Sequence, residues 1–202
     1  MRISRNIKCK KFPCPGVRHE NYMVPDIEVK PEDKSIIMIS EAAPPDPADY
    51  YYTKGNPLFD QTTVQAFKDA GADVSSTRDL LDLGIYLTTA VKCGKIEYGI
   101  KAGVIKECSL ILEKETALFP NVKAFMLMGD VAIKAINYIA RRSGDNRVIP
   151  AGSTYKIRGK AYFFKGKRAF PSYLQAGPSF FIEKSKRRMI AEDIGEALKL
   201  LT

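Results

Sequence analysis

The sequence predicts an α/β protein built on a parallel sheet with helices on both faces. The first of three observations predicts this class, and the other two describe an ordinary globular domain. Strand-like and helix-like segments alternate along the chain, which is the order of parallel strands joined by crossover helices. The composition, 45% apolar and 27% charged, is ordinary for a globular protein. A domain of 202 residues buries roughly 70% of the surface that its unfolded chain exposes, so the fold needs no disulfide bonds.

The elements of the first half follow from local patterns. Four prolines make 1–34 an irregular N-terminal arm. The apolar run at 35–40 is a short buried strand, and the prolines of 41–59 exclude regular structure from a long loop. A helix is expected at 60–71, with Asp60 as its N-cap and Gly71 at its C-terminal end. A second helical segment is expected at 75–84.

The second half continues the alternation. β-branched and aromatic residues predict a strand at 85–91, and apolar spacing predicts a helix over 100–119. We also expect a strand at 122–128, helices at 130–144 and 185–201, and a strand with a turn within 161–172. We expect one domain over 1–202.

In such sheets, ligands bind beyond the carboxyl ends of the strands. The loop at 41–59, the strand end at 89–93, the turn near 129 and a turn at 170–172 are expected to share that edge.

The net charge of +9 is concentrated in one part of the chain. Residues 156–188 hold ten Lys or Arg against one acid, Glu183. Such a window is either a solvated basic face or a phosphate-binding surface. The basic N-terminus lacks the apolar core of a signal peptide, and no apolar run is long enough to span a bilayer. We therefore expect a cytoplasmic protein without a membrane partner.

Two pairs of cysteines, Cys9 with Cys14 and Cys93 with Cys108, are expected to be reduced thiols in a cytosolic protein. One interpretation is four unrelated thiols, which are common buried residues. The other is a metal centre, because four thiolates can ligate tetrahedral zinc or an iron–sulfur cluster. The cysteine positions alone do not distinguish zinc from an iron–sulfur cluster.

Three segments resemble one family. "TTAVKC" at 88–93, "KEC" at 106–108 and "AFMLMGDVAIKAI" at 124–136 are similar to motifs of the uracil-DNA glycosylase superfamily, in its iron–sulfur members. The match runs from about Cys9 to the C-terminus. The resemblance implies a three-layer α/β/α sandwich around a short parallel sheet. It also implies a 4Fe-4S cluster on Cys9, Cys14, Cys93 and Cys108, with zinc as the alternative. The gap between the first two cysteines is wider than is usual in the family.

The family's first active-site motif corresponds to "SEAAPPDPADYYY" after the first strand. Aligned on Ala43 and Pro44, Asp46 takes the place of the water-orienting acid. Glu41 or Ser40 replaces the first glycine, depending on the register, so Glu41 is the second candidate acid. The segment "GNPLF" resembles the one whose Phe stacks on a flipped base, which makes Phe59 a base-binding candidate or a core residue.

Two further positions depart from the family. Thr89 stands where an Asn reads the base, and it lacks the paired donor and acceptor of an amide. Phe170 stands where a His stabilises the departing base, in a segment that reads Phe-Pro-Ser. The single histidine of the chain, His19, lies far from this motif.

Ser172 of that segment is suited to a phosphate-binding turn, and Lys167 and Arg168 are expected to bind phosphate with it. The sequence therefore predicts retained phosphate binding and altered base recognition. The first functional hypothesis is a DNA glycosylase for a damaged or deaminated base. The second is a nucleic-acid-binding relative without glycosylase activity. A third is an unrelated α/β protein with a redox cluster.

Overall fold

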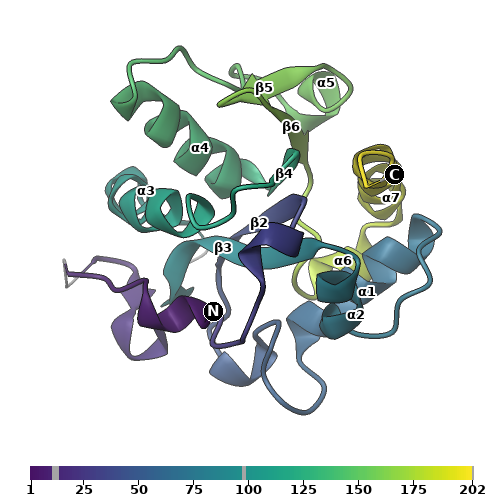
Figure 1. Cartoon of the computed structure of the whole chain (residues 1–202), viewed down its shortest axis with the longest axis horizontal. Helices are drawn as coiled ribbons and strands as arrows, with labels where there is room; N and C mark the ends of the chain where they lie inside the picture. The colour runs from purple at the N-terminus through teal and green to yellow at the C-terminus, as the bar shows by residue number, and fades with distance from the viewer. Residues whose placement is uncertain (11–13, 97–98, 202) are drawn as a thin grey trace.

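A computed structural model of the chain describes residues 1–10, 14–96 and 99–201. In this part, six strands form one sheet in the order β1-β3-β2-β4-β6-β5 (Figure 1). The four inner strands are parallel, and the two edge strands are antiparallel to their neighbours. The strands are β1 (Val17–Arg18), β2 (Ile36–Ala43), β3 (Ile85–Lys95), β4 (Ala124–Met128), β5 (Tyr162–Phe164) and β6 (Lys167–Ser172). The predicted α/β class is confirmed, and the sheet is mixed.

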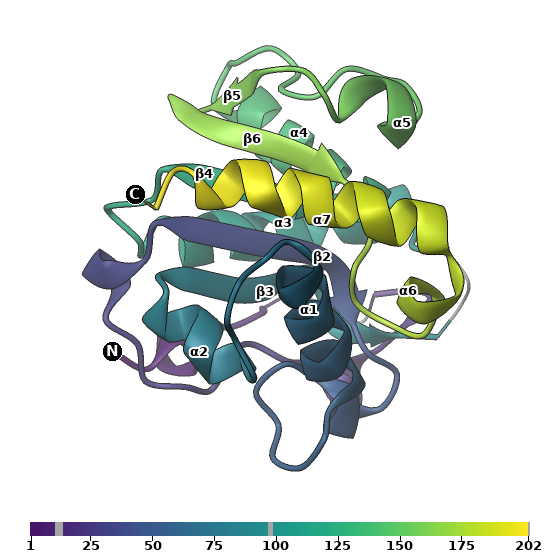
Figure 2. The ribbon, with the colours of Figure 1, turned by 90° about the vertical axis from the view of Figure 1, so that its right-hand side faces the viewer.

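Helices lie on both faces of this sheet (Figures 1 and 2). On one face lie α3 (Ala102–Thr116) and α4 (Asp130–Arg142). On the other lie α1 (Leu58–Asp69), α2 (Thr77–Asp82), α6 (Ser179–Ile182) and α7 (Lys184–Leu198), and α5 (Thr154–Ile157) contacts β6. Short 3-10 helices are η1 (Ile3–Arg5), η2 (His19–Asn21), η3 (Pro31–Asp33) and η4 (Pro47–Asp49). None of the helices in the described ranges combines the length and apolar character needed to cross a bilayer.

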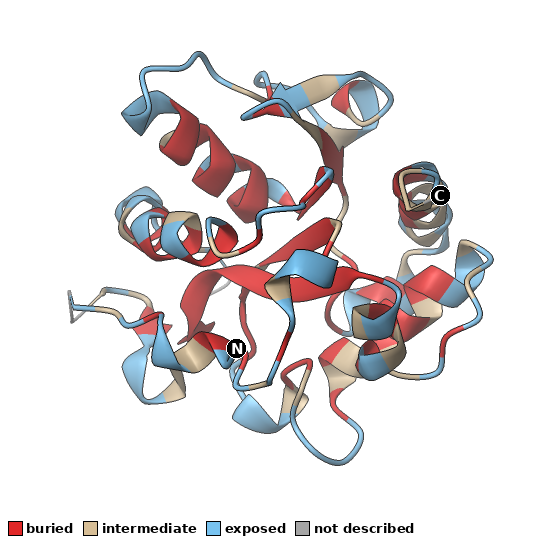
Figure 3. Cartoon of the chain, in the orientation of Figure 1, coloured by how far each residue is buried: buried red, intermediate tan, exposed pale blue. Residues whose placement is uncertain are grey.

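The core divides between the two faces of the sheet. Along β2, Ile37 and Ile39 belong to the core beneath α3 and α4, while Ile36 and Met38 belong to the core beneath α1 and α7. This alternation follows from the two-residue period of a strand. Figure 3 shows the buried residues along the sheet and on the sides of the helices that face it.

The N-terminal arm is attached to the end of β3. Val17 pairs with Lys95, and Arg18 pairs with Gly94. A β-carbon at Gly94 would lie 2.9 Å from Cβ of Asn21, so only glycine lets the arm pass this closely. The irregular arm that we expected therefore contains a strand and 3-10 turns, because pairing with β3 supplies order that its prolines do not suggest.

The expected turn at 170–172 is wrong, because these residues continue β6. Phe170 pairs with Met126, and Ser172 pairs with Met128. Pro171 is tolerated because β5 pairs with β6 only as far as Ala169. Beyond that point β6 has a free edge, where a missing N–H costs nothing. The strands β2 and β3 also extend further than we expected, to residues 43 and 95.

Candidate functional site

The sheet changes its direction of winding between β2 and β4. The chain leaves β2 toward α1 on one face and leaves β4 toward α4 on the other. Ligands of α/β proteins bind at the carboxyl ends of the strands at such a switch point. A cleft of about 270 Å³ opens there, and its lining includes Glu41 at the end of β2 and Gly129 after β4.

Glu41 lies against the first turn of α4. Its carboxylate accepts hydrogen bonds from the backbone N–H groups of Asp130 and Val131. Burial raises the pKa of this carboxyl, although these hydrogen bonds and the charge of Lys95 oppose the shift. A cleft carboxyl with a raised pKa is suited to proton transfer. The same contacts also cap the helix, so Glu41 has a structural role as well.

Two basic residues of α7 form another wall of the cleft. Lys186 pairs with Glu183, and its Nζ lies 5.5 Å from the ring centre of Tyr173. Arg187 donates from Nη2 to Oδ1 of Asp69 at 2.8 Å, and its Nε also pairs with that carboxylate. Both cations therefore face the cleft with an acidic partner beside them.

Asp46, the other candidate acid, lies outside the described lining of the cleft. It is exposed, and its Oδ1 accepts a hydrogen bond from the backbone N–H of Ala48 at 2.9 Å. This bond caps η4. The structure thus separates the two candidate acids and gives Asp46 a local structural role.

The three base-binding candidates are buried. Phe59 and Phe170 are 9% and 8% exposed, and both belong to the core beneath α1 and α7. The ring of Phe59 packs against that of Tyr51, with centroids 5.2 Å apart. Thr89 is fully buried, and its hydroxyl has no hydrogen-bond partner among the described residues. None of the three lies in the described lining of the cleft.

A buried polar cluster that the sequence did not predict lies in the same core region. The amide nitrogen of Gln175 donates to Ser40 Oγ and Tyr51 OH, both at 3.0 Å, and to Thr63 Oγ1 at 3.3 Å. Burial raises the pKa of Tyr51 to about 12. These polar groups satisfy one another and fix the end of β2 to α1 and to the segment after β6. A glutamine three residues beyond a strand is too weak a signal to predict this.

The phosphate-binding candidates do not gather at one place. Lys167 and Arg168 begin β6 and Ser172 ends it, so about 16 Å separates Lys167 from Ser172 along the strand. The Ser172 hydroxyl is buried and donates to Oδ2 of Asp193 at 2.5 Å. Arg158 also donates to this oxygen, at 3.0 Å. Ser172 therefore contacts a carboxylate in this structure.

The four cysteines come together from the arm, β3 and α3. Cys93 and Cys108 are buried, and Cys9 and Cys14 are half-buried. Burial, followed by the charges of Cys108, Cys9 and Cys14, raises the pKa of Cys93 to about 12. Burial likewise raises the pKa of Cys108 to about 11, with contributions from Cys14 and Cys9. The four sulfur atoms are thus near enough to interact electrostatically.

The surroundings of these thiols are also defined. Nδ1 of His19 lies 3.8 Å from Sγ of Cys93, so the single histidine lies beside the cysteines. The backbone N–H and the ammonium of Lys92 both favour the thiolate of Cys108. Among the residues that the structure describes, no group of three or more His, Cys, Asp or Glu side chains is arranged to hold a metal ion.

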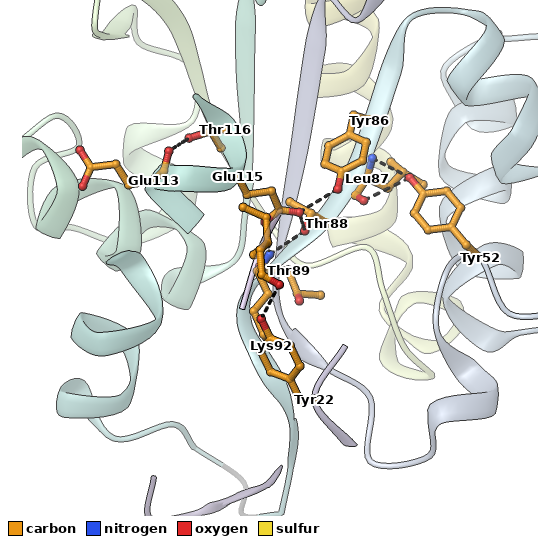
Figure 4. Close-up of polar contacts among 11 residues, drawn as sticks. Tyr22, Tyr52, Tyr86, Leu87, Thr88, Thr89, Lys92, Glu113, Glu115 and Thr116 are labelled. Atoms are coloured by element: carbon orange, nitrogen blue, oxygen red, sulfur yellow. Dashed lines mark hydrogen bonds and ion pairs between the residues drawn. The ribbon is translucent and has the colours of Figure 1, made fainter. Parts of the chain in front are cut away.

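A buried ion pair between Lys92 and Glu115 joins β3 to α3 (Figure 4). Lys92 and Glu115 are fully buried and pair directly. Lys92 also donates to Thr88 Oγ1 at 2.7 Å, and Tyr86 donates to Glu115 Oε1 at 2.8 Å. The pair sets the position of β3 relative to α3, the two elements that carry Cys93 and Cys108. The sequence signal that could have indicated this ion pair is Lys92, a lysine within an otherwise apolar strand.

No protein-family model matches this chain, and no curated protein matches it.

Proposed function

We propose that the protein is a DNA-binding relative of the uracil-DNA glycosylase superfamily, with the switch-point cleft as its nucleotide site. The position of Glu41 carries this proposal, because a partly buried carboxyl with a raised pKa lines a cleft at the topological switch point. The parallel order β3-β2-β4-β6, with helices on both faces, supports the three-layer α/β/α sandwich of that superfamily.

In the proposed reaction the protein hydrolyses the N-glycosidic bond of a damaged or deaminated base. The nucleotide leaves the duplex stack at a cost of a few kcal/mol. Glu41 accepts a proton from the attacking water, whose oxygen bonds to the anomeric carbon as the bond to the base breaks. Lys186 and Arg187 attract the neighbouring phosphates. Glu41 is a better candidate than Asp46, whose carboxylate is exposed and caps η4.

The cofactor that we propose is a 4Fe-4S cluster on Cys9, Cys14, Cys93 and Cys108. The donor set fits the group, since four thiols from three parts of the chain interact with one another. A cluster is larger than a single ion, so its ligand sulfurs need not converge on one point as those of a zinc site must. When bound, it would supply a rigid link between the arm, β3 and α3.

The second candidate function is DNA binding without base release. The burial of Phe59, Thr89 and Phe170 favours it, because none of these residues lines the cleft. Phe170 also lacks the donor that a histidine offers to a departing base. One such donor is worth roughly 100- to 1000-fold in rate.

Base release on defined DNA distinguishes the two functions. Labelled oligonucleotides carrying uracil, hypoxanthine, xanthine or a mismatch are incubated with the protein and then treated with alkali. Scission that Glu41→Gln abolishes, while Asp46→Asn and the exposed control Glu32→Gln retain it, supports the glycosylase. Salt-dependent binding without scission supports the second function. Absence of DNA binding contradicts both.

The cofactor is tested separately by anaerobic purification and metal analysis. We expect about four iron atoms per chain with broad visible absorbance, and loss of both in Cys108→Ser. One zinc per chain in a colourless protein would identify the alternative. A preparation that contains neither metal after reconstitution contradicts the proposed centre.

A further inference from the structure

The chain has an unusually basic segment on the β5 side of the sheet. Between Asp145 and Glu183 there is no acidic residue. The same segment holds seven basic residues: Arg147, Lys156, Arg158, Lys160, Lys165, Lys167 and Arg168. We call the part from α5 through the β5–β6 hairpin, residues 154–168, the α5–β5 strip.

Large aromatic side chains are exposed along this strip. Tyr155 is 70% exposed and Phe163 is 60% exposed. Phe163 lies opposite Arg168 in the antiparallel register, and Cζ of Arg168 is 5.5 Å from the ring centre of Phe163. Burying an aromatic ring is worth several times more than burying a small side chain. Tyr155 and Phe163 are thus two large exposed rings within a segment rich in cations.

Several cations of the strip are available to a polyanion. Lys156 and Lys160 are exposed and Lys167 is half-buried. None of these three forms an ion pair within the described ranges. Aromatic rings interleaved with lysines are the arrangement that binds single-stranded nucleic acid, since bases stack on the rings while phosphates contact the cations.

The two ends of the strip adjoin hollows of the surface. At one end, Thr154 lines the switch-point cleft. At the other, a hollow of about 350 Å³ lies beside the hairpin tip, lined by Phe163, Lys165, Arg147 and also Asp145. Figure 2 shows α5 near the tip of the β6 arrow and β5 toward the start of that strand. The strip thus leads from the cleft along the edge of the sheet to the hairpin.

We propose that the α5–β5 strip binds an unpaired DNA strand, with bases stacked on Phe163 and Tyr155 and phosphates held by Lys156, Lys160 and Lys167. The inference rests on the proposed function in one respect, since the strand would continue into the switch-point cleft. It adds a second contact surface and a preference for single-stranded over duplex DNA. In a duplex the bases are stacked on one another and do not present a free face to Phe163.

The test is fluorescence anisotropy with a labelled 20-nucleotide oligo(dT) and a labelled 20-base-pair duplex. Phe163→Ala should weaken binding of the single strand roughly 5- to 150-fold, the effect of losing one stacked base. Duplex binding should change less than about twofold. The matched control is Phe181→Ala on α6, where the ring is 44% exposed outside the strip. Circular dichroism checks that both variants are folded.

The lysines are tested by salt dependence. Replacing Lys160 and Lys167 by Gln should lower the slope of log K against log salt by about 1.4, or roughly 0.7 per lost phosphate contact on a single strand. The control pair is Lys106→Gln with Lys114→Gln, two exposed positions of α3. An unchanged slope in the strip variant, or an equal change in both pairs, overturns the phosphate assignment.

Two other outcomes decide the stacking role. Equal binding by Phe163→Ala and Phe181→Ala overturns it. So does an equal loss of heparin and DNA binding in Phe163→Ala, because heparin carries charge but no bases. The proposed glycosylase is judged independently by base release from substrates. If the strip variants lose single-strand binding but the protein releases no base, the proposed reaction alone is refuted. If base release occurs and is unaffected by Phe163→Ala and Lys160→Gln, the proposed role of the strip alone is refuted.

Discussion

Glu41 fills the space where a side chain at position 129 would lie. A β-carbon on Gly129 would be 2.6 Å from Oε1 of Glu41, and φ of Gly129 is +96°. We predict that Gly129→Ala destabilises the fold by about 2–4 kcal/mol, because backbone strain and a steric clash add. Urea denaturation measures the loss.

The matched control is Gly144→Ala. Gly144 also has a positive φ, +81°, but an added β-carbon would meet no atom within 4 Å. This variant should lose only the strain, about 1–2 kcal/mol. If both variants lose the same free energy of unfolding, the steric clash with Glu41 does not contribute to the cost of Gly129→Ala.

The raised pKa of Glu41 predicts a dependence of stability on pH. Burial raises the folded-state pKa above the ordinary value of 4.5, while Lys95 and Asp130 act on the carboxyl with opposite signs. Between 4.5 and the folded value, the native state binds more protons than the unfolded state, so this group's contribution to stability falls as pH rises. Glu41→Gln lacks this contribution, so its stability relative to the wild type should increase with pH across that window. Urea midpoints from pH 4 to 8 measure it. A flat or decreasing difference, or the same trend in Glu32→Gln, would contradict the assignment.

The buried pair of Lys92 and Glu115 predicts a strong asymmetry between single and double variants. Lys92→Met leaves a buried carboxylate without its cation, which costs about 3–5 kcal/mol. Lys92→Met with Glu115→Leu removes both charges and should recover most of that loss. Tyr86→Phe should cost about 1.5–3 kcal/mol, the value of a hydrogen bond to a charged group. Denaturant midpoints of the three variants test this, and a double variant no more stable than Lys92→Met would contradict it.

Because Ser172 donates a hydrogen bond to Asp193, we predict that Ser172→Ala lowers stability and leaves DNA affinity unchanged. The hydroxyl donates to a buried carboxylate, so its loss should cost about 1.5–3 kcal/mol of unfolding free energy. DNA binding, measured by anisotropy, should stay within about twofold of the wild type. A tenfold loss of affinity with unchanged stability would restore the phosphate-binding role that the sequence predicted.

Much of the fold was predictable because its elements carry strong local patterns. The helix at 130–144 was expected within two residues of α4 (Asp130–Arg142), since a strand-ending glycine and a regular apolar period mark it. The pairing of Val17 with Lys95 was not predictable, because nothing in a two-residue strand reveals a partner 78 positions away (95 − 17). The same holds for the position of Pro171 in β6, which depends on where β5 ends.

The site was predictable only in outline. The cleft lies beside Glu41 and Gly129, within two of the four places that the rule for parallel strands named, because that rule depends on topology and not on side chains. Which acid lines the cleft was beyond the sequence, since Glu41 and Asp46 differ in their neighbours and not in their chemistry. Likewise, Phe59 and Phe170 are aromatic residues that suit either a base or a core. Their burial depends on α1 and α7, whose packing no local pattern describes.

The pairing of the arm with the end of β3 has a consequence for synthesis of the chain. Val17 leaves the ribosome 78 residues before Lys95, which at 5–20 residues per second is roughly 4–16 s. During that interval Cys9 and Cys14 are already translated while β3 is not, so a thiol-reactive reagent can reach them more easily than in the folded protein, where both are half-buried.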